Sequence, residues 1–269
     1  MAMVKVGELN VEYYVEGSGP PLLMIMGLGG QANSWGEPFL EKLRPHFQLI
    51  RFSNRGTGLT DKPGGEYAVR LMADDAAGLL RELGTARAHV LGISMGGMIA
   101  QELALNHPQA VRGLVLGCTF CGPAHGVHLP PQTLARLGQV GALPLGQRIE
   151  QFWLITVTQR FIETNKPFLD GIIQTHLATP TPWETFGRQF VAVQSFDTYD
   201  RLPQIKAPTL IVQGDQDMLI PVQNADILRE RIPGAQARII TDVGHCFFWE
   251  KPEESAGAIV EFLKSAVPA

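Results

Sequence analysis

The chain has 269 residues, of which 45% are hydrophobic and 18% are charged, and its formal net charge is -4. This length suits one α/β domain with room for an insertion, and the composition excludes a disordered chain. The negative charge balance offers nothing that attracts polyanions, so we expect no nucleic-acid partner.

The N-terminal segment, residues 1–8, lacks the basic and apolar regions of a secretory signal. The most apolar short run, residues 22–26, is far too short to cross a bilayer, so we expect no membrane partner. Three cysteines are an odd and low number, which is typical of a reducing compartment. The simplest interpretation is a cytoplasmic protein, although a processed precursor would have the same features.

The elements expected in the first half of the chain alternate between strand and helix patterns. Strands are indicated by period-two alternation or by short, fully apolar runs, and helices by apolar residues at helical spacing. They are a hairpin over residues 4–15, strands at 22–26, 47–52, 89–93 and 111–116, and helices at 71–83 and 95–106.

The alternation stops at residues 122–202, where prolines and aromatic residues are frequent and no clear strand pattern occurs. We therefore predict a core formed by residues 1–121 and 203–269, interrupted by a helical cap. Buried strands alternating with helices predict an α/β fold with a mostly parallel sheet covered on both faces. The later expected elements are helices at 131–137, 149–157, 167–176, 183–196 and 253–264, and strands at 209–213 and 237–240.

A candidate nucleophile lies in the run Gly92-Ile93-Ser94-Met95-Gly96-Gly97, between an expected strand and an expected helix. A serine hydroxyl is a poor nucleophile at neutral pH, so it needs a base beside it and an exposed position. The Gly-x-Ser-x-Gly turn supplies the exposure, because its glycines let strand and helix approach closely. The alternative is a glycine-rich turn without chemistry, but the strand and helix on either side favour Ser94 as a nucleophile.

The base and the acid should follow downstream, the acid first. His245 follows the final expected strand, whereas the other six histidines lie upstream of the Gly-x-Ser-x-Gly turn, close to it, or in the predicted cap. Three aspartates compete for the acid. Asp217 lies deep in the loop after residues 209–213 and is our choice, Asp215 suits a turn former, and Asp242 is a weaker candidate.

Five stretches in the expected order make the chain resemble the serine α/β-hydrolase fold superfamily over essentially its whole length. They are Gly27-Leu28-Gly29, Arg55-Gly56-Thr57-Gly58, residues 92–97, the spacing from Gly214 through Asp217 to Pro221, and Gly244-His245. The resemblance independently assigns the acid to Asp217. It implies a central eight-stranded, mostly parallel sheet flanked by helices, with a helical cap.

An acyl-transfer reaction needs two N–H donors for its oxyanion. One should be the backbone N–H of Met95, directly after the nucleophile. The resemblance implies the N–H of Leu28 as the other. The chain departs from its relatives at Met26, where many carry histidine, and at Ser53, where aspartate is frequent.

Several other motifs are interpreted as structural, without a role in chemistry. Cys118 and Cys121 spell Cys-x-x-Cys but lack further ligands, and His125 and His128 lack a third one, so we expect no metal. The glycines after residue 26 lack a phosphate-loop pattern. We expect no cofactor.

Large apolar residues in the cap and in core loops predict an apolar pocket over Ser94. We expect a small, largely apolar substrate. The candidate lining residues are Trp35, Phe120, Trp153, Trp183 and Phe247.

The leading hypothesis is a carboxylic ester hydrolase of the EC 3.1.1 type. A lactonase acting on enol-lactones or acyl-homoserine lactones is the first alternative, because enol-lactonases resemble this chain in size and also lack the loop histidine. A ligand receptor or partner-binding regulator, and a cofactor-free perhydrolase or haloperoxidase, stay open. A haloalkane dehalogenase is disfavoured, because it requires aspartate at position 94.

Overall fold

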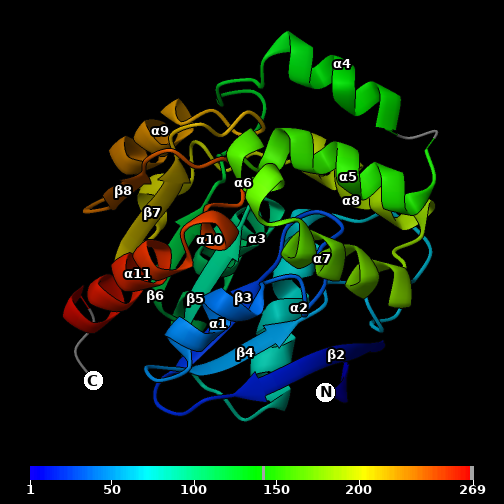
Figure 1. Cartoon of the computed structure of the whole chain (residues 1–269). Coiled ribbons are helices and arrows are strands. Elements are labelled where there is room, and N and C mark those ends of the chain that lie inside the picture. Colours follow the sequence, from blue (N-terminus) through cyan, green and yellow to red (C-terminus); the bar gives the residue numbers. More distant parts are fainter. Residues whose placement is uncertain (141–142, 267–269) are drawn as a thin grey trace.

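The computed structural model of the protein describes residues 1–140 and 143–266, and a central sheet organises them (Figure 1). Its eight strands follow the order β1-β2-β4-β3-β5-β6-β7-β8. The pairs β1–β2 and β2–β4 are antiparallel and all others are parallel, so the prediction of a mostly parallel eight-stranded sheet is confirmed. The strands are β1 (Ala2–Val6), β2 (Leu9–Glu16), β3 (Pro21–Ile25), β4 (Gln48–Phe52), β5 (Ala88–Ile93), β6 (Val111–Gly117), β7 (Thr209–Gly214) and β8 (Gln236–Ile240).

Two hydrophobic clusters cover the two faces of this sheet. Alternate residues of β3 divide between them: Leu23 and Ile25 belong to one, and Leu22 and Met24 to the other. Helices α2 (Val69–Glu82) and α3 (Met95–Asn106) pack into the first, and α1 (Glu37–Leu43) and α11 (Pro252–Ala266) into the second. A sheet buried on both faces explains why its central strands are apolar runs without alternation.

Among the described residues, five α-helices lie between β6 and β7 and gather beyond the carboxyl ends of the central strands (Figure 1). They contact the loops that follow β3 and β8: the Gly29 N–H donates to Gln189 at 2.9 Å, and the Cys246 N–H donates to the Thr156 carbonyl at 2.8 Å. These helices fall within the predicted cap, whose status as a separate unit stays a prediction. They are α4 (Pro131–Val140), α5 (Leu145–Thr156), α6 (Gln159–Thr164), α7 (Lys166–Ala178) and α8 (Trp183–Gln194).

The sequence analysis did not predict the short helices. The α-helices α1, α6, α9 (Gln223–Arg231) and α10 (Phe247–Glu250) have nine residues or fewer, and η1 (Pro108–Ala110) and η2 (Leu202–Gln204) are single 3₁₀ turns. Segments this short show too few turns for an apolar periodicity to emerge.

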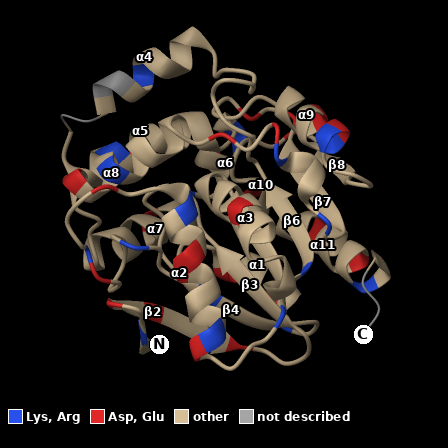
Figure 2. Ribbon diagram, turned by 180° about the vertical axis from the view of Figure 1, so that it is seen from behind, with Lys and Arg blue, Asp and Glu red and all other residues tan. Residues whose placement is uncertain are grey.

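Basic and acidic residues lie close together on α2, α9 and α11 (Figure 2). No helix within the described ranges is long and apolar enough to span a membrane.

A buried histidine in β5 makes stability depend on pH. His89 is 2% exposed, and burial, followed by the charges of Arg112 and Arg87, lowers its pKa from 6.5 to about 4. Between these values the unfolded chain binds more protons than the folded one, so the free energy of unfolding falls as the pH falls. Between pH 7 and pH 5 the free energy of unfolding, measured by urea denaturation, should fall by about 1–2 kcal/mol less in His89→Gln than in the wild type.

The matched control for this prediction is His128→Gln, at an exposed loop position. It should lose stability between the two pH values as the wild type does. An unchanged pH dependence in His89→Gln would contradict a role for this ring.

Candidate active site

The loop that joins β5 to α3 holds Ser94 in a strained conformation. Its backbone angles are φ 55° and ψ -124°, and its N–H donates to the Gly117 carbonyl at 2.9 Å. Residues rarely adopt such angles unless surrounding structure enforces them, at a cost of about 1–3 kcal/mol. A Cβ atom at Gly92 would lie 2.1 Å from the Gly96 carbonyl oxygen, and one at Gly96 would lie 2.0 Å from that of Ile25. The positions two residues before and two residues after Ser94 therefore require glycine.

A buried carboxylate meets an imidazole at the neighbouring strand ends. Asp217 follows β7, His245 follows β8, and Asp217 Oδ2 lies 2.7 Å from His245 Nδ1. The aspartate side chain is 0% exposed, and that of His245 is 7% exposed. A charge-assisted hydrogen bond of this length fixes the orientation of the ring and directs Nε2 away from the carboxylate.

Three further donors hold the Asp217 carboxylate. The N–H groups of Leu219 and Ile220 each donate to Oδ1 at 2.8 Å, and Gln213 Nε2 donates to Oδ2 at 2.7 Å. Together with His245, the carboxylate therefore has four hydrogen-bonding neighbours. Both oxygens of the Asp217 side chain thus accept hydrogen bonds from neighbours on more than one side.

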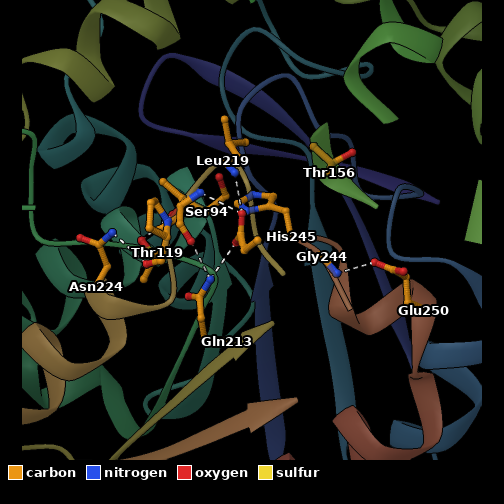
Figure 3. A network of polar contacts seen from close by, with 12 residues as sticks. Ser94, Thr119, Thr156, Gln213, Leu219, Asn224, Gly244, His245 and Glu250 are labelled. Atoms are coloured by element: carbon orange, nitrogen blue, oxygen red, sulfur yellow. Dashed lines mark hydrogen bonds and ion pairs between the residues drawn. The ribbon is translucent and has the colours of Figure 1, made fainter. Parts of the chain in front are cut away.

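Ser94 and His245 both lie at the carboxyl ends of the parallel strands (Figure 3), and Ser94 is partly exposed. Among the described residues no hydrogen bond joins the serine to the histidine. The other two aspartates weighed from the sequence are exposed: Asp215 accepts a 3.4 Å contact from the Val243 N–H, and Asp242 has φ 54°. The structure therefore brings Asp217, and neither alternative, to His245.

Two backbone N–H groups near Ser94 have no partner among the described residues. One belongs to Met95, the first residue of α3, and the other to Leu28 in the loop after β3. A Cβ atom at Gly27 would lie 2.9 Å from the Ser94 Cβ, so this loop passes directly beside the serine. These two N–H groups can donate hydrogen bonds to an anionic oxygen beside Ser94.

Glu250 holds the loop before His245 by hydrogen bonds, and the sequence analysis did not single it out. Its Oε1 accepts the Gly244 N–H at 2.7 Å, directly before His245, and its Oε2 accepts from the backbone N–H and the hydroxyl of Thr158. Burial raises the pKa of this carboxyl, while the Thr158 hydroxyl acts against that shift. Glu250 thus ties the histidine loop to the start of α6. It has no sequence signal, because no motif surrounds it.

The Cys-x-x-Cys motif carries no reactive thiol. Cys118 and Cys121 are buried and unpaired, and burial raises the pKa of both thiols. Burial likewise raises the pKa of Cys246, next to His245. These thiols are held in the protonated form. Within the described part of the chain, no group of three or more His, Cys, Asp or Glu residues could hold a metal ion.

Comparison with known proteins identifies the family. The sequence model of the alpha/beta hydrolase fold matches residues 20–252. The chain belongs to the alpha/beta hydrolase fold family. A protein from Azorhizobium caulinodans that carries the name carbamate hydrolase RutD is 28% identical over 247 residues, which cover 92% of each chain.

Two solved structures of this family resemble the chain closely in fold. A thermophilic esterase from Thermogutta terrifontis has a TM-score of 0.85 and 26% identity, and the match covers 99% of this chain and 100% of the esterase. An enzyme that degrades N-acyl homoserine lactones has a TM-score of 0.79 and 30% identity, covering 97% and 100%. Hydrolytic activity is thus supported by family and relatives alike.

The departure from the family pattern at Ser53 has a structural explanation. The Ser53 hydroxyl donates to Glu12 Oε2 at 2.7 Å and accepts the Ala32 N–H at 3.0 Å. The same Glu12 oxygen accepts the Leu59 N–H at 2.9 Å. A glutamate on β2 thus supplies the buried carboxylate that an aspartate at position 53 would bring.

Three of the aromatic residues predicted to line the pocket pack in the core. Trp35 and Phe247 are 0% exposed and Trp153 is 7% exposed, all within one hydrophobic cluster. Trp35 stacks on Phe39 at 6.1 Å between ring centroids. We therefore leave Trp35, Trp153 and Phe247 out of the proposed pocket.

A group of aromatic side chains reaches the Leu28 loop through Phe186. A Cβ atom at Gly29 would lie 3.0 Å from the Phe186 ring, which stacks on Trp183 at 5.0 Å and meets Phe152 edge-on at 6.0 Å. Trp183 is 46% exposed, and the predicted Phe120 is partly buried. Apolar rings therefore stand beside the loop that would hold the oxyanion.

Proposed function

We propose that the protein is a serine hydrolase that cleaves a carboxylic ester of a small, largely apolar substrate through an acyl-enzyme intermediate. The observation that carries the proposal is the buried Asp217–His245 hydrogen bond of 2.7 Å at the sheet edge that also bears the strained Ser94. A fixed imidazole can act as the base for a partly exposed serine hydroxyl at the same strand ends.

In the proposed reaction, His245 Nε2 takes the proton of the Ser94 hydroxyl as Oγ attacks the ester carbonyl. The N–H groups of Leu28 and Met95 donate to the resulting oxyanion. When the C–O bond to the alcohol breaks, the imidazolium returns its proton to the leaving oxygen. His245 then activates a water that cleaves the acyl-enzyme, while Asp217 keeps the ring oriented and stabilises its charge.

The aromatic group of Phe152, Trp183 and Phe186 supports an apolar substrate. Phe186 lies against Gly29 in the Leu28 loop, and the other two rings pack on Phe186, so an acyl or aromatic part bound along this group would begin close to Ser94. Its burial would contribute binding free energy of about 25 cal/mol per Å² of apolar area.

The decisive experiment is reaction with an alkyl fluorophosphonate, followed by peptide mass spectrometry. The label should lie on Ser94 and should be prevented by prior incubation with a slowly hydrolysed ester. p-Nitrophenyl esters of graded acyl length should be hydrolysed with kcat/KM highest for apolar acyl groups. A wild-type protein that stays unlabelled while its fold is intact would overturn the proposal.

Lactone hydrolysis is the second candidate. It is favoured by the 30% identity to an enzyme that degrades N-acyl homoserine lactones, which spans 97% of this chain. The same serine would attack the lactone carbonyl, and the leaving alcohol would stay tethered to the acyl group. A ratio of kcat/KM above about tenfold in favour of lactones over linear esters of equal acyl length would select this candidate.

A further inference from the structure

Gln189 on α8 is a polar side chain that is completely buried between the cap helices and the Leu28 loop. It is 0% exposed, and both ends of its amide are occupied. Its Oε1 accepts the Gly29 N–H at 2.9 Å, and its Nε2 donates to the Arg55 carbonyl at 3.0 Å. A buried amide with both partners in place favours one orientation of each group that it binds.

The bond from Gly29 to Gln189 holds one of three successive peptide units, the middle one of which carries the Leu28 N–H. In that unit the Gly27 carbonyl accepts the Gly30 N–H at 3.0 Å. Since a trans peptide is planar, this bond directs the Leu28 N–H to the opposite side. The preceding unit is held by Asn54, whose Nδ2 donates to the Met26 carbonyl at 2.9 Å. Gln189 holds the following unit.

The other end of Gln189 rests on a rigid part of the core. The side chain of Arg55, whose carbonyl accepts from Gln189, forms two hydrogen bonds of 2.6 and 2.7 Å with Asp75 on α2. Both ionic side chains are nearly buried, with 10% and 13% exposure. Gln189 therefore transmits a fixed position from α2 to the loop beside Ser94.

We propose that Gln189 is a positioning residue for the oxyanion hole, so that the geometry of the Leu28 N–H depends on the seating of α8. This inference rests on the proposed function. Gly29 has φ 70°. Glycine adopts positive and negative φ about equally readily, so the loop needs an external partner to select one geometry. Small displacements matter because a misplacement of about 1 Å can lower a rate about a hundredfold.

The test is Gln189→Met, which keeps the length of the side chain and removes both hydrogen bonds. For p-nitrophenyl butyrate, kcat should fall roughly 10- to 100-fold while KM changes less than about twofold, because the lost interaction acts in the transition state. Inhibition by butylboronic acid, whose serine adduct is tetrahedral, should weaken by a factor similar to the loss in kcat.

Arg188→Met is the matched control. Arg188 is the neighbouring residue of α8, and its guanidinium donates to the Pro63 carbonyl at 2.7 Å, so it also joins the cap helices to the core, but away from the Leu28 loop. This variant should lose stability and keep kcat, KM and boronic-acid inhibition within about twofold of the wild type.

A second variant, Gln189→Asn, keeps the amide but is one methylene too short to reach Gly29 and Arg55 together, and its kcat should fall at least about fivefold. The inference is overturned if either folded Gln189 variant matches Arg188→Met, or if the loss lies entirely in KM. A wild type without label on Ser94 would instead overturn the proposed function, so the two failures are distinguishable.

Discussion

Replacing Ser94 with alanine should lower kcat for ester hydrolysis by about 10⁶-fold and abolish labelling by a fluorophosphonate. The substitution removes the attacking oxygen and leaves His245 and the N–H groups of Leu28 and Met95 in place. Residual hydrolysis, about 10³-fold above the rate in water, should remain from oxyanion stabilisation alone. Stopped assays with p-nitrophenyl butyrate at high enzyme concentration measure this remaining activity.

The stability of Ser94 variants separates strain from chemistry. Alanine meets the same backbone strain as serine at φ 55°, so Ser94→Ala should unfold at nearly the wild-type urea concentration. Ser94→Gly relieves the strain and should raise the free energy of unfolding by about 1 kcal/mol. Ser195→Ala, at the end of α8, is the control for loss of a hydroxyl and should keep full activity. Retention of more than about 1% of kcat in Ser94→Ala would contradict the assignment.

The central elements were predictable because each shows several turns or a complete apolar run. The expected helix at residues 95–106 agrees with α3, and the expected strand at 89–93 differs from β5 by one residue. The short α10 was missed, although it begins at Phe247, two residues after His245. The chain is held at Cys246 by Thr156 and at Glu250 by Thr158, and no local pattern reveals these long-range hydrogen bonds.

For the site, the sequence indicated the residues that form motifs and missed those that hold them. Asp217 could be chosen from the loop order, whereas Gln213, Glu250 and Gln189 act through partners 4, 6 and 160 positions away in the chain. A buried polar residue at the end of an apolar strand was a signal for Gln213. Nothing local distinguishes Gln189 from an exposed helix residue, since only the tertiary structure buries it.

Replacing Asp217 with asparagine should lower kcat by about 10⁴-fold. All four hydrogen-bond contacts to the carboxylate come from donors: His245, Gln213 and the N–H groups of Leu219 and Ile220. The NH₂ group of an asparagine must face two of them, whichever way the amide turns. If it faces His245, the ring shifts its proton to Nε2 and can no longer accept the proton of Ser94. The unmatched donors should also lower the free energy of unfolding by about 1–3 kcal/mol.

Two matched substitutions test whether this effect belongs to Asp217 alone. Asp215→Asn and Asp242→Asn change exposed carboxylates in the same two loops, and asparagine tolerates the positive φ of Asp242. Both variants should keep kcat within about twofold of the wild type. If one of them instead lost activity while Asp217→Asn stayed within about tenfold of the wild type, the acid would be misassigned. The predicted contrast follows from burial, because only Asp217 holds its partner away from water.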